Sequence, residues 1–370
     1  MIRKIKSLLL AFPGFDWACR ALTRRHVRAF MYHRFCNDDP PSSRRTSVAL
    51  LRRQLAYLAS RCQVVDPDEQ ARVEDGPAIR PVRPLAVITV DDGYADFHDY
   101  AFPVLRELGI PATLFVTTGF VDGTCWMWWD RIRWALEHTD QSRVEFSFRE
   151  EVLRGELTTD AGRSAFWQTL VPALRFVADG EKEGVVAQLA AELAVTIPAE
   201  APPRYAPTTW AQIVTMAEAG VTMGAHTRTH PILSQLDSKA AMAEIVGCRD
   251  DLAARLGWAP KWFAYPQGGP ADFNAETESL VAQAGFSGCY VAYLDLASEG
   301  KRWARHRYNA VSNWTDFRWT VSGADYLVLK LRRLLGLSTC GVPDSYWQGK
   351  DLVDGPVARS HDIAWTANQL

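Results

Sequence analysis

A continuous apolar run that ends in two carboxylates constrains the fold of this chain more than any other feature. Leu85–Val90 has the sequence Leu-Ala-Val-Ile-Thr-Val, and Asp91, Asp92 and Gly93 follow directly. Because the run does not alternate between apolar and polar residues, it predicts a strand buried on both faces of a parallel sheet. Sheets of this kind place their chemistry at the carboxyl ends of the strands. The two aspartates are therefore either part of a functional site, where a cation offsets their mutual repulsion, or an ordinary Asp-Gly turn.

Strand and helix patterns alternate along most of the chain. Short apolar segments predict strands at 28–32, 62–65, 85–90, 112–116, 221–225, 262–265, 286–291 and 307–311. Helical periodicity fills most of the intervals, at 47–60, 96–108, 209–220, 238–256 and 274–284. Seven or eight strands that alternate with helices predict an α/β fold, a distorted (β/α)7-8 barrel with a helical insertion. An open, doubly wound sheet is the alternative.

The same alternation of strand and helix patterns indicates the domain organisation of the chain. We expect a basic N-terminal segment at 1–27, a barrel at 28–320 and an extension at 321–370 that packs or frays. Within the barrel, an insertion occupies about 121–207, where Leu153–Leu193 is mostly helical in pattern and Pro198–Pro207 is rich in proline. Insertions are tolerated on loops at the functional end of a sheet, and we expect this one there.

Charge is distributed unevenly along the chain. The first 30 residues carry seven Lys or Arg and one Asp, so their net charge is +6, whereas the remainder carries −8. The acidic main body gives no reason to expect a nucleic acid as partner. The basic N-terminus either makes a peripheral contact with an anionic membrane surface or is a solvated tail. Its apolar run at Ser7–Phe12 is short and is followed by Pro13-Gly14 and no cleavage site, so we interpret it as uncleaved.

Cysteine usage and hydropathy bear on location. The seven cysteines are scattered and include no Cys-x-x-Cys pair, which favours a reducing compartment over a disulfide framework or a thiolate metal site. No window of about 18 apolar residues is present to cross a membrane. We therefore expect a cytoplasmic protein, with any membrane contact made peripherally at the inner face of the cell membrane.

A second polar cluster follows another predicted strand. His226 directly follows Val221–Ala225, and His230 comes four residues later. Two histidines at this spacing can bind one metal, although one surface and one core histidine give the same pattern. Their place at a strand end, like that of Asp91 and Asp92, favours the metal. Two imidazoles and one carboxylate leave coordination positions open, as in a catalytic zinc site, and the other carboxylate can then act as a base.

Three motifs occur in order along the chain: Thr-Val-Asp-Asp-Gly at Thr89–Gly93, His-Thr-Arg-Thr-His at His226–His230, and Phe-Ala-Tyr-Pro-Gln-Gly at Phe263–Gly268. Together they resemble the polysaccharide deacetylase family, the metal-dependent N-deacetylases of chitin, peptidoglycan and related glycans. Met31–Arg34 (Met-Tyr-His-Arg) also resembles the first strand of the bacterial exopolysaccharide-type branch. The resemblance covers about 28–312 without the insertion.

The resemblance implies a fold, a cofactor and residue roles. The family's fold is a distorted (β/α) barrel, and its metal is usually zinc, sometimes cobalt or another divalent ion. By correspondence, Asp91 is the catalytic base, and the metal ligands are Asp92, His226 and His230.

The resemblance also implies where the oxyanion is bound and how the leaving amine is protonated. The turn formed by Tyr265, Pro266 and Gln267 corresponds to the oxyanion and substrate site, with the backbone donor near Gln267. Family members use a histidine from a late strand as the general acid. His306 is the best-placed residue for that role, with His33 as a second candidate.

Two further features leave alternatives open. The family often has an arginine two residues before the proline of the third motif, where it orients the base, but this chain has Ala264 there. Arg305 or Arg307 could supply the missing cation. Trp128 and its neighbours Trp126 and Trp129 either stack on sugar rings at the site or pack in the core of the insertion.

We therefore predict a metal-dependent hydrolase that removes N-acetyl groups from an N-acetylated sugar, a polysaccharide or a lipid-linked glycan precursor, with a biosynthetic role. One alternative is a cyclic-amide hydrolase of the same family. Another is a non-catalytic, glycan-binding relative.

Overall fold

The computed structural model describes residues 2–37, 45–75, 81–149, 151–296, 300–337 and 339. The chain forms two compact units. Among the described residues, the second unit runs from Asp122 to Pro207, and the first contains those before and after it.

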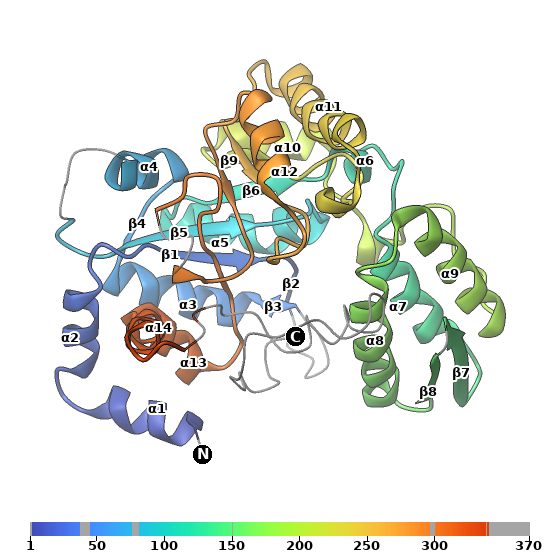
Figure 1. The fold of residues 1–370 in the computed structure, drawn as a ribbon, viewed down its shortest axis with the longest axis horizontal. Helices are drawn as coiled ribbons and strands as arrows, with labels where there is room; N and C mark the ends of the chain where they lie inside the picture. The colour runs from blue at the N-terminus through green and yellow to red at the C-terminus, as the bar shows by residue number, and fades with distance from the viewer. Residues whose placement is uncertain are drawn as a thin grey trace. The chain divides into compact units, whose positions relative to one another are not determined.

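The first unit is built on a parallel sheet of eight strands (Figure 1). The strand order is β11-β10-β9-β6-β5-β1-β12, and β4 also pairs with β5. The strands are β1 (Arg28–Tyr32), β4 (Gln63–Val64), β5 (Leu85–Val90), β6 (Thr113–Val116), β9 (Thr222–Ala225), β10 (Trp262–Ala264), β11 (Gly288–Tyr290) and β12 (Tyr308–Asn309). All eight predicted strands are present. The sheet curls into a half-barrel, and a parallel bridge from Tyr290 to Arg305 ties β11 to the segment that leads into β12. The fold is therefore the predicted distorted barrel rather than an open sheet.

Helices connect these strands. They are α3 (Val48–Arg61), α4 (Pro67–Asp75), η1 (Phe97–Ala101), α5 (Phe102–Leu108), α6 (Thr118–Val121), α10 (Trp210–Glu218), η3 (Leu233–Gln235), α11 (Ser238–Leu256) and α12 (Ala275–Gln283), with a short pair β2 (Phe35–Cys36) and β3 (Thr46–Ser47). Local sequence fixes their ends. The Thr209 hydroxyl accepts from Gln212 N and the Gln212 side chain accepts from Thr209 N, and these two bonds form a capping box at the start of α10.

The sheet is buried on both faces, as the continuous apolar runs predict. All six residues of β5 are buried. Close packing between strands also depends on Gly224 in β9, because a Cβ atom there would collide with the Phe115 ring of β6.

Four helices at the two ends of the chain pack together in the first unit. They are α1 (Ile2–Ala11), α2 (Phe15–Leu22), α13 (Trp314–Ser322) and α14 (Ala324–Leu334). Of the two alternatives for the basic N-terminus, the solvated tail is therefore wrong, since Leu10 and Cys19 are buried against Trp319. The boundary expected at 320 falls inside α13, and most of the expected extension at 321–370 lies outside the described residues. In the described part, no helix is both long and apolar enough to span a bilayer.

The second unit is not purely helical, contrary to expectation. It contains α7 (Trp128–His138), α8 (Asp160–Leu174), α9 (Asp179–Glu192) and the short η2 (Pro203–Tyr205), and also an antiparallel hairpin of β7 (Arg143–Phe148) and β8 (Glu151–Glu156). Leu153, expected to begin a helical region, lies in β8. Every second residue of β7 is buried (Val144, Phe146, Phe148), a period-two pattern typical of a half-buried strand.

Candidate metal centre

The end of β5 places two buried carboxylates side by side. Asp91 N–H donates to Tyr32 O at 3.0 Å, so the pairing of β1 with β5 extends to Asp91. Asp92 (φ 75°) and Gly93 (φ 94°) then adopt left-handed conformations in succession, which turns the chain sharply. The backbone of Thr117 donates to Asp92 O at 3.2 Å and holds this turn against the end of β6. Asp91 and Asp92 are only 2% and 4% exposed.

The structure brings Asp92 together with the two histidines that follow β9. One donor atom from each of Asp92, His226 and His230 lies within 4.8 Å of the others. Asp92 Oδ1 is 3.6 Å from His226 Nε2 and 3.5 Å from His230 Nε2. All three side chains are buried. Among the described residues, no other group of three or more His, Cys, Asp or Glu side chains converges in this way.

His226 is oriented as metal-binding histidines are. Its Nδ1 lies 2.7 Å from Ala264 O, and this contact requires the proton on Nδ1. Nε2 therefore keeps its lone pair toward Asp92. Burial lowers the pKa of His226 to about 4, so the imidazole is neutral at neutral pH. A neutral imidazole held by a carbonyl through its second nitrogen is the usual arrangement of a metal ligand.

The loop between the two histidines is strained and is held from outside. Thr227 (φ 65°) and His230 (φ 64°) are both left-handed, and the Thr227 hydroxyl accepts from His230 N at 3.1 Å. Glu244 of α11 accepts from the backbone N–H groups of Arg228 (2.8 Å) and Thr229 (2.9 Å) and from the Thr229 hydroxyl (2.8 Å). Glu244 could not be identified from the sequence, because nothing in the helical pattern of α11 distinguishes it from the other polar residues of that helix.

Replacing Glu244 with Ala should weaken divalent-metal binding by about 10–100-fold, since such supporting contacts typically contribute that much to metal affinity. The measurement is a competition titration with a metal chelator. Asp250→Ala, on the same helix, is the matched control, because that carboxylate bonds to Arg249 and should leave affinity unchanged. Equal affinity of the Glu244→Ala variant and the native protein would show that the loop holds its shape without this clamp.

Arg307 provides the cation that the third motif lacks. Its Nη1 donates to Asp91 Oδ1 at 2.6 Å and to Thr89 Oγ1 at 3.2 Å, and its Nε donates to Val291 O at 3.0 Å. The guanidinium is buried. Arg305, the other candidate, pairs instead with Glu74 and Asp75.

These charges decide the protonation state of Asp91. Burial alone would raise the pKa of this carboxyl, but the charges of Arg307, His226 and His33 lower it, and the net result is a pKa below the usual range. Asp91 is therefore ionised at neutral pH and its oxygen Oδ1 is fixed by Arg307. A carboxylate in this state can accept a proton from a group beside it.

His306 does not join the cluster. Its Nδ1 lies 3.3 Å from Asp295 N and 3.2 Å from Tyr293 O, and its charge is among those that act on His26, which precedes β1. The neighbouring Arg307 points into the barrel, and adjacent residues of an extended segment face opposite ways. The expectation that His306 lies at the site is therefore corrected. The second candidate, His33, follows β1, is exposed, and is close enough for its charge to act on Asp91.

The turn after β10 has an unusual backbone. Gln267 (φ 59°) and Gly268 (φ 64°) are both left-handed, and Gly268 N–H donates to Pro266 O at 2.6 Å. Pro266 is buried and Gln267 half-buried. The Tyr265 ring is 1% exposed and stacks on Phe273 with ring centroids 4.4 Å apart, so this side chain packs in the core beneath the turn.

Trp128 belongs to the second unit. Its ring is half-buried, packs edge-on against Trp129 with centroids 5.5 Å apart, and has Lys182 Nζ 5.4 Å from its centroid. Both tryptophans pack against the hydrophobic core of that unit. These contacts favour the core interpretation, and a sugar contact stays a prediction.

The donor set fits a divalent ion. Two imidazoles and one carboxylate are ligands of zinc and of related divalent metals, and three protein ligands leave positions open for water or substrate. The described cysteines are free thiols, and none belongs to the cluster. The site therefore combines a potential metal centre with an ionised, arginine-bound carboxylate.

Comparisons with known proteins agree with the fold and the motifs. The family model for polysaccharide deacetylases matches residues 79–143 and 180–289. The structure resembles the deacetylase PplD of Streptococcus pyogenes in complex with acetate (TM-score 0.51, 16% identity, 78% of this chain and 93% of that chain). It also resembles IcaB from Ammonifex degensii (TM-score 0.51, 19% identity, 80% of this chain and 96% of that chain). No curated protein matched the sequence. The family model therefore identifies a polysaccharide deacetylase domain in this chain.

Proposed function

We propose that this protein is a metal-dependent hydrolase that removes the N-acetyl group from an N-acetylated sugar. One observation carries the proposal: the buried cluster of Asp92, His226 and His230 stands next to Asp91, which Arg307 keeps ionised. Zinc is the metal we expect, with cobalt or another divalent ion as a substitute.

Asp92, His226 and His230 would hold the ion. A bound divalent ion lowers the pKa of water toward about 7 and polarises the carbonyl oxygen of the acetyl group. The protein's contribution is to orient both imidazoles, through Ala264 O for His226 and through the Glu244 clamp for the loop that carries His230.

Asp91 is the proposed base. Because Arg307 bonds to Oδ1, the proton of the attacking water goes to Oδ2. Arg307 is a positioning residue, since it orients the carboxylate and keeps it ionised without contacting substrate. The two adjacent aspartates therefore have different proposed roles: Asp92 binds the metal, and Asp91 accepts the proton of the water.

Two further groups complete the proposed reaction. The departing amine must be protonated for the C–N bond to break, and we assign this role to His33, because it is exposed at the end of β1 and follows Tyr32, the register partner of Val90, which precedes Asp91. The backbone N–H of Gln267 is the proposed donor to the oxyanion, since the left-handed turn after Pro266 presents it at the end of β10.

The family acts on acetylated glycans, and we propose an N-acetylated polysaccharide, oligosaccharide or lipid-linked glycan precursor as the substrate. The likeness to PplD supports the reaction type, since that protein is a deacetylase whose structure contains acetate, the product expected here. The Met-Tyr-His-Arg sequence at Met31–Arg34 favours the exopolysaccharide-type branch and hence a role in exopolysaccharide biosynthesis.

Acetate release from N-acetylglucosamine oligosaccharides tests the proposal. The protein should bind one divalent ion, lose activity when a chelator removes it and regain activity with zinc or cobalt. Asp92→Ala and His226→Ala should neither retain metal nor release acetate, and circular dichroism checks that they fold. Unchanged activity in these variants would disprove the site. A metal-loaded protein that opens cyclic amides, or that binds the glycans without turnover, would instead indicate one of the two alternatives.

A further inference from the structure

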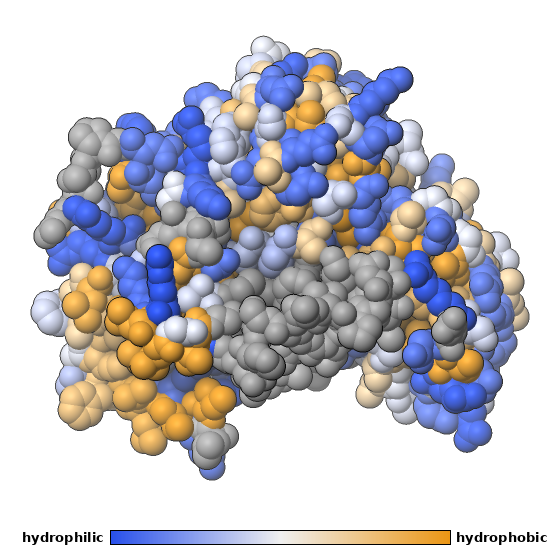
Figure 2. All heavy atoms as spheres, in the orientation of Figure 1, coloured by the Kyte–Doolittle hydropathy of each residue, from blue (hydrophilic) through white to orange (hydrophobic). Residues whose placement is uncertain are grey.

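The terminal helices of the first unit expose a large apolar surface. Figure 2 shows hydrophobic residues gathered over α1, α2 and α14. We define the terminal apolar face by six of them: Leu8, Phe12, Trp17, Leu22, Leu331 and Leu334. Their exposed fractions run from 57% for Leu331 to 84% for Leu334. Contiguous exposed apolar surface of this kind marks an interaction site.

The pattern on two of the helices is the same. In α1 the exposed apolar residues are Ile2, Ile5, Leu8 and Leu9. In α14 they are Val328, Leu331 and Leu334, and Leu335 directly follows the helix, so the spacing is identical. This spacing places four residues on one side of a helix. Leu10 and Leu329 are buried on the opposite sides, so each helix has an apolar contact toward the protein and an apolar stripe toward the outside.

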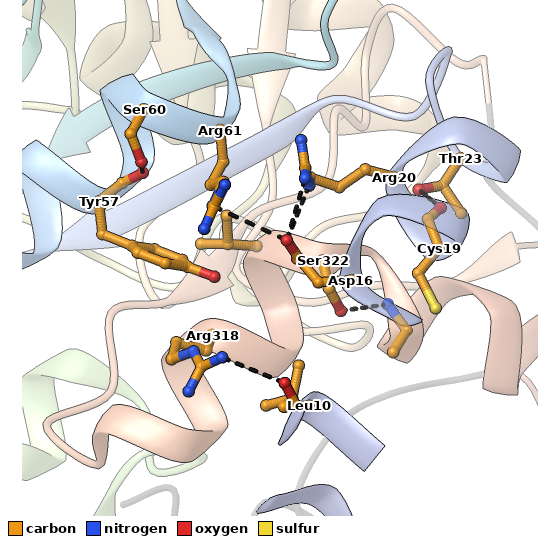
Figure 3. Close-up of polar contacts among 12 residues, drawn as sticks. Leu10, Asp16, Cys19, Arg20, Thr23, Tyr57, Ser60, Arg61, Arg318 and Ser322 are labelled. Carbon is orange, nitrogen blue, oxygen red and sulfur yellow. Dashed lines mark hydrogen bonds and ion pairs between the residues drawn. The ribbon is translucent and has the colours of Figure 1, made fainter. Parts of the chain in front are cut away.

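The helices are held in a fixed orientation by polar contacts on their inner sides. Figure 3 shows Arg318 of α13 donating to the carbonyl oxygen of Leu10 (3.4 Å) at the end of α1. It also shows Asp16 of α2 beside Arg20 (3.0 Å) and Arg61 of α3 (3.7 Å). The outward stripe is therefore a property of a packed helix rather than of a fraying end.

Further contacts join α1 and α2 to α13. Arg3 and Lys6 both pair with Asp316, at 3.0 and 2.8 Å. Phe15 stacks on Trp319 with ring centroids 5.7 Å apart. The inner sides of both helices are thus occupied, and among the described residues the terminal apolar face stays exposed.

The charge around this face is strongly positive. Helices α1, α2 and α14 contain seven Lys or Arg and two Asp, and one of these, Asp325, is buried and bonded to Thr320. The exposed bases include Lys4, Lys330 and Arg333. The main body of the chain is acidic by contrast. A suitable partner therefore has to accept apolar side chains and carry negative charge around them.

We propose that the terminal apolar face docks the protein peripherally on a membrane that contains anionic lipids. A lipid surface satisfies both requirements, because acyl chains take the leucine and aromatic side chains while anionic headgroups meet the bases. A second copy of the chain would place positive surfaces against each other. Such lipids are found at the cytoplasmic leaflet. Membrane docking through this face does not depend on the reaction proposed for the metal centre.

Co-sedimentation with lipid vesicles tests this surface on the full chain. The protein should bind vesicles of phosphatidylcholine and phosphatidylglycerol in equal parts far more tightly than vesicles of phosphatidylcholine alone, and added salt should weaken the binding. The combined variant Leu8→Gln, Leu331→Gln and Leu334→Gln should bind at least about 100-fold more weakly.

A second variant separates the charge contribution. Lys4→Gln, Lys330→Gln and Arg333→Gln together should lower binding to the anionic vesicles by about 100-fold, or about fivefold for each charge, and leave binding to phosphatidylcholine unchanged. Trp258→Gln is the control, since Trp258 is 46% exposed and lies in the loop after α11. It should bind like the native chain.

Each contrary result is distinct. Equal binding to both vesicle types, or unchanged binding by the triple leucine variant, overturns the proposal. A native dimer in light scattering that becomes monomeric in the leucine variant, without vesicle binding, also overturns it and assigns the face to a second copy. Thermal unfolding confirms that the variants fold, and Leu→Ala changes at the same positions replace the glutamine set if it does not.

Discussion

Asp91→Asn should lower the rate of acetate release by about 10²–10⁴-fold while the divalent metal stays bound. Asparagine has the shape of aspartate but cannot take a proton from water. The ligands Asp92, His226 and His230 are untouched by the change. The rate is measured by acetate release, and metal content by elemental analysis of the purified variant.

Asp92→Asn is the matched comparison, since the two carboxylates are adjacent and both buried. It should lose metal and activity together, because an amide oxygen is a weaker ligand than a carboxylate for a divalent cation. If Asp91→Asn also loses its metal, Asp91 is a ligand rather than the base. If Asp91→Asn keeps the native rate, another group takes the proton.

Much of the fold could be predicted because its strands are buried on both faces. Such strands are continuous apolar runs, and the helices between them end at glycines or begin at capping boxes, so local sequence determines both. The metal cluster was also accessible to sequence reasoning. Asp92, His226 and His230 follow predicted strands directly, and the parallel arrangement brings strand ends to one edge.

The groups that complete the site depend on tertiary contacts that local patterns do not contain. Arg305 and Arg307 are two residues apart in the chain, and only the course of the segment into β12 decides that Arg307 reaches Asp91 while Arg305 pairs with Glu74. His306 was favoured by its place in the order of motifs, whereas its actual neighbours come from the loop after β11.

Two expectations about local structure were wrong. Val144, Phe146 and Phe148 alternate with polar residues, and this pattern predicts a strand inside the insertion that was expected to be helical. The outward apolar stripes of α1 and α14 have helical spacing, but a stripe that faces away from the core gives no indication of how these helices pack.

Replacing Arg307 with Met should destabilise the metal-free protein by about 3–5 kcal/mol near neutral pH, because it leaves the buried Asp91 carboxylate without its cation. Methionine keeps much of the side-chain volume, so the cost reports the lost charge and hydrogen bonds rather than a cavity. The measurement is the free energy of unfolding from denaturant titration. Arg307→Lys keeps the positive charge but not the three hydrogen bonds of the guanidinium, and its stability should lie between those of the native protein and Arg307→Met.

The pH dependence of this loss identifies its cause. With Arg307 present, the pKa of Asp91 is lower in the folded protein than in the unfolded chain. The ionised carboxylate therefore stabilises the fold above the unfolded-state pKa, and this stabilisation is lost as the pH falls through the folded-state pKa. Without Arg307, burial raises the pKa, and ionisation of Asp91 then costs stability until the carboxyl is protonated. The free energy of unfolding that Arg307→Met loses relative to the native protein should therefore be smaller at about pH 4 than at about pH 7.

The double variant Asp91→Asn with Arg307→Met should be more stable than Arg307→Met alone near neutral pH, because no unpaired charge remains. If Arg307→Met loses the same stability at both pH values, or if the double variant is no more stable than Arg307→Met, then Arg307 stabilises the protein through packing and not through its charge on Asp91.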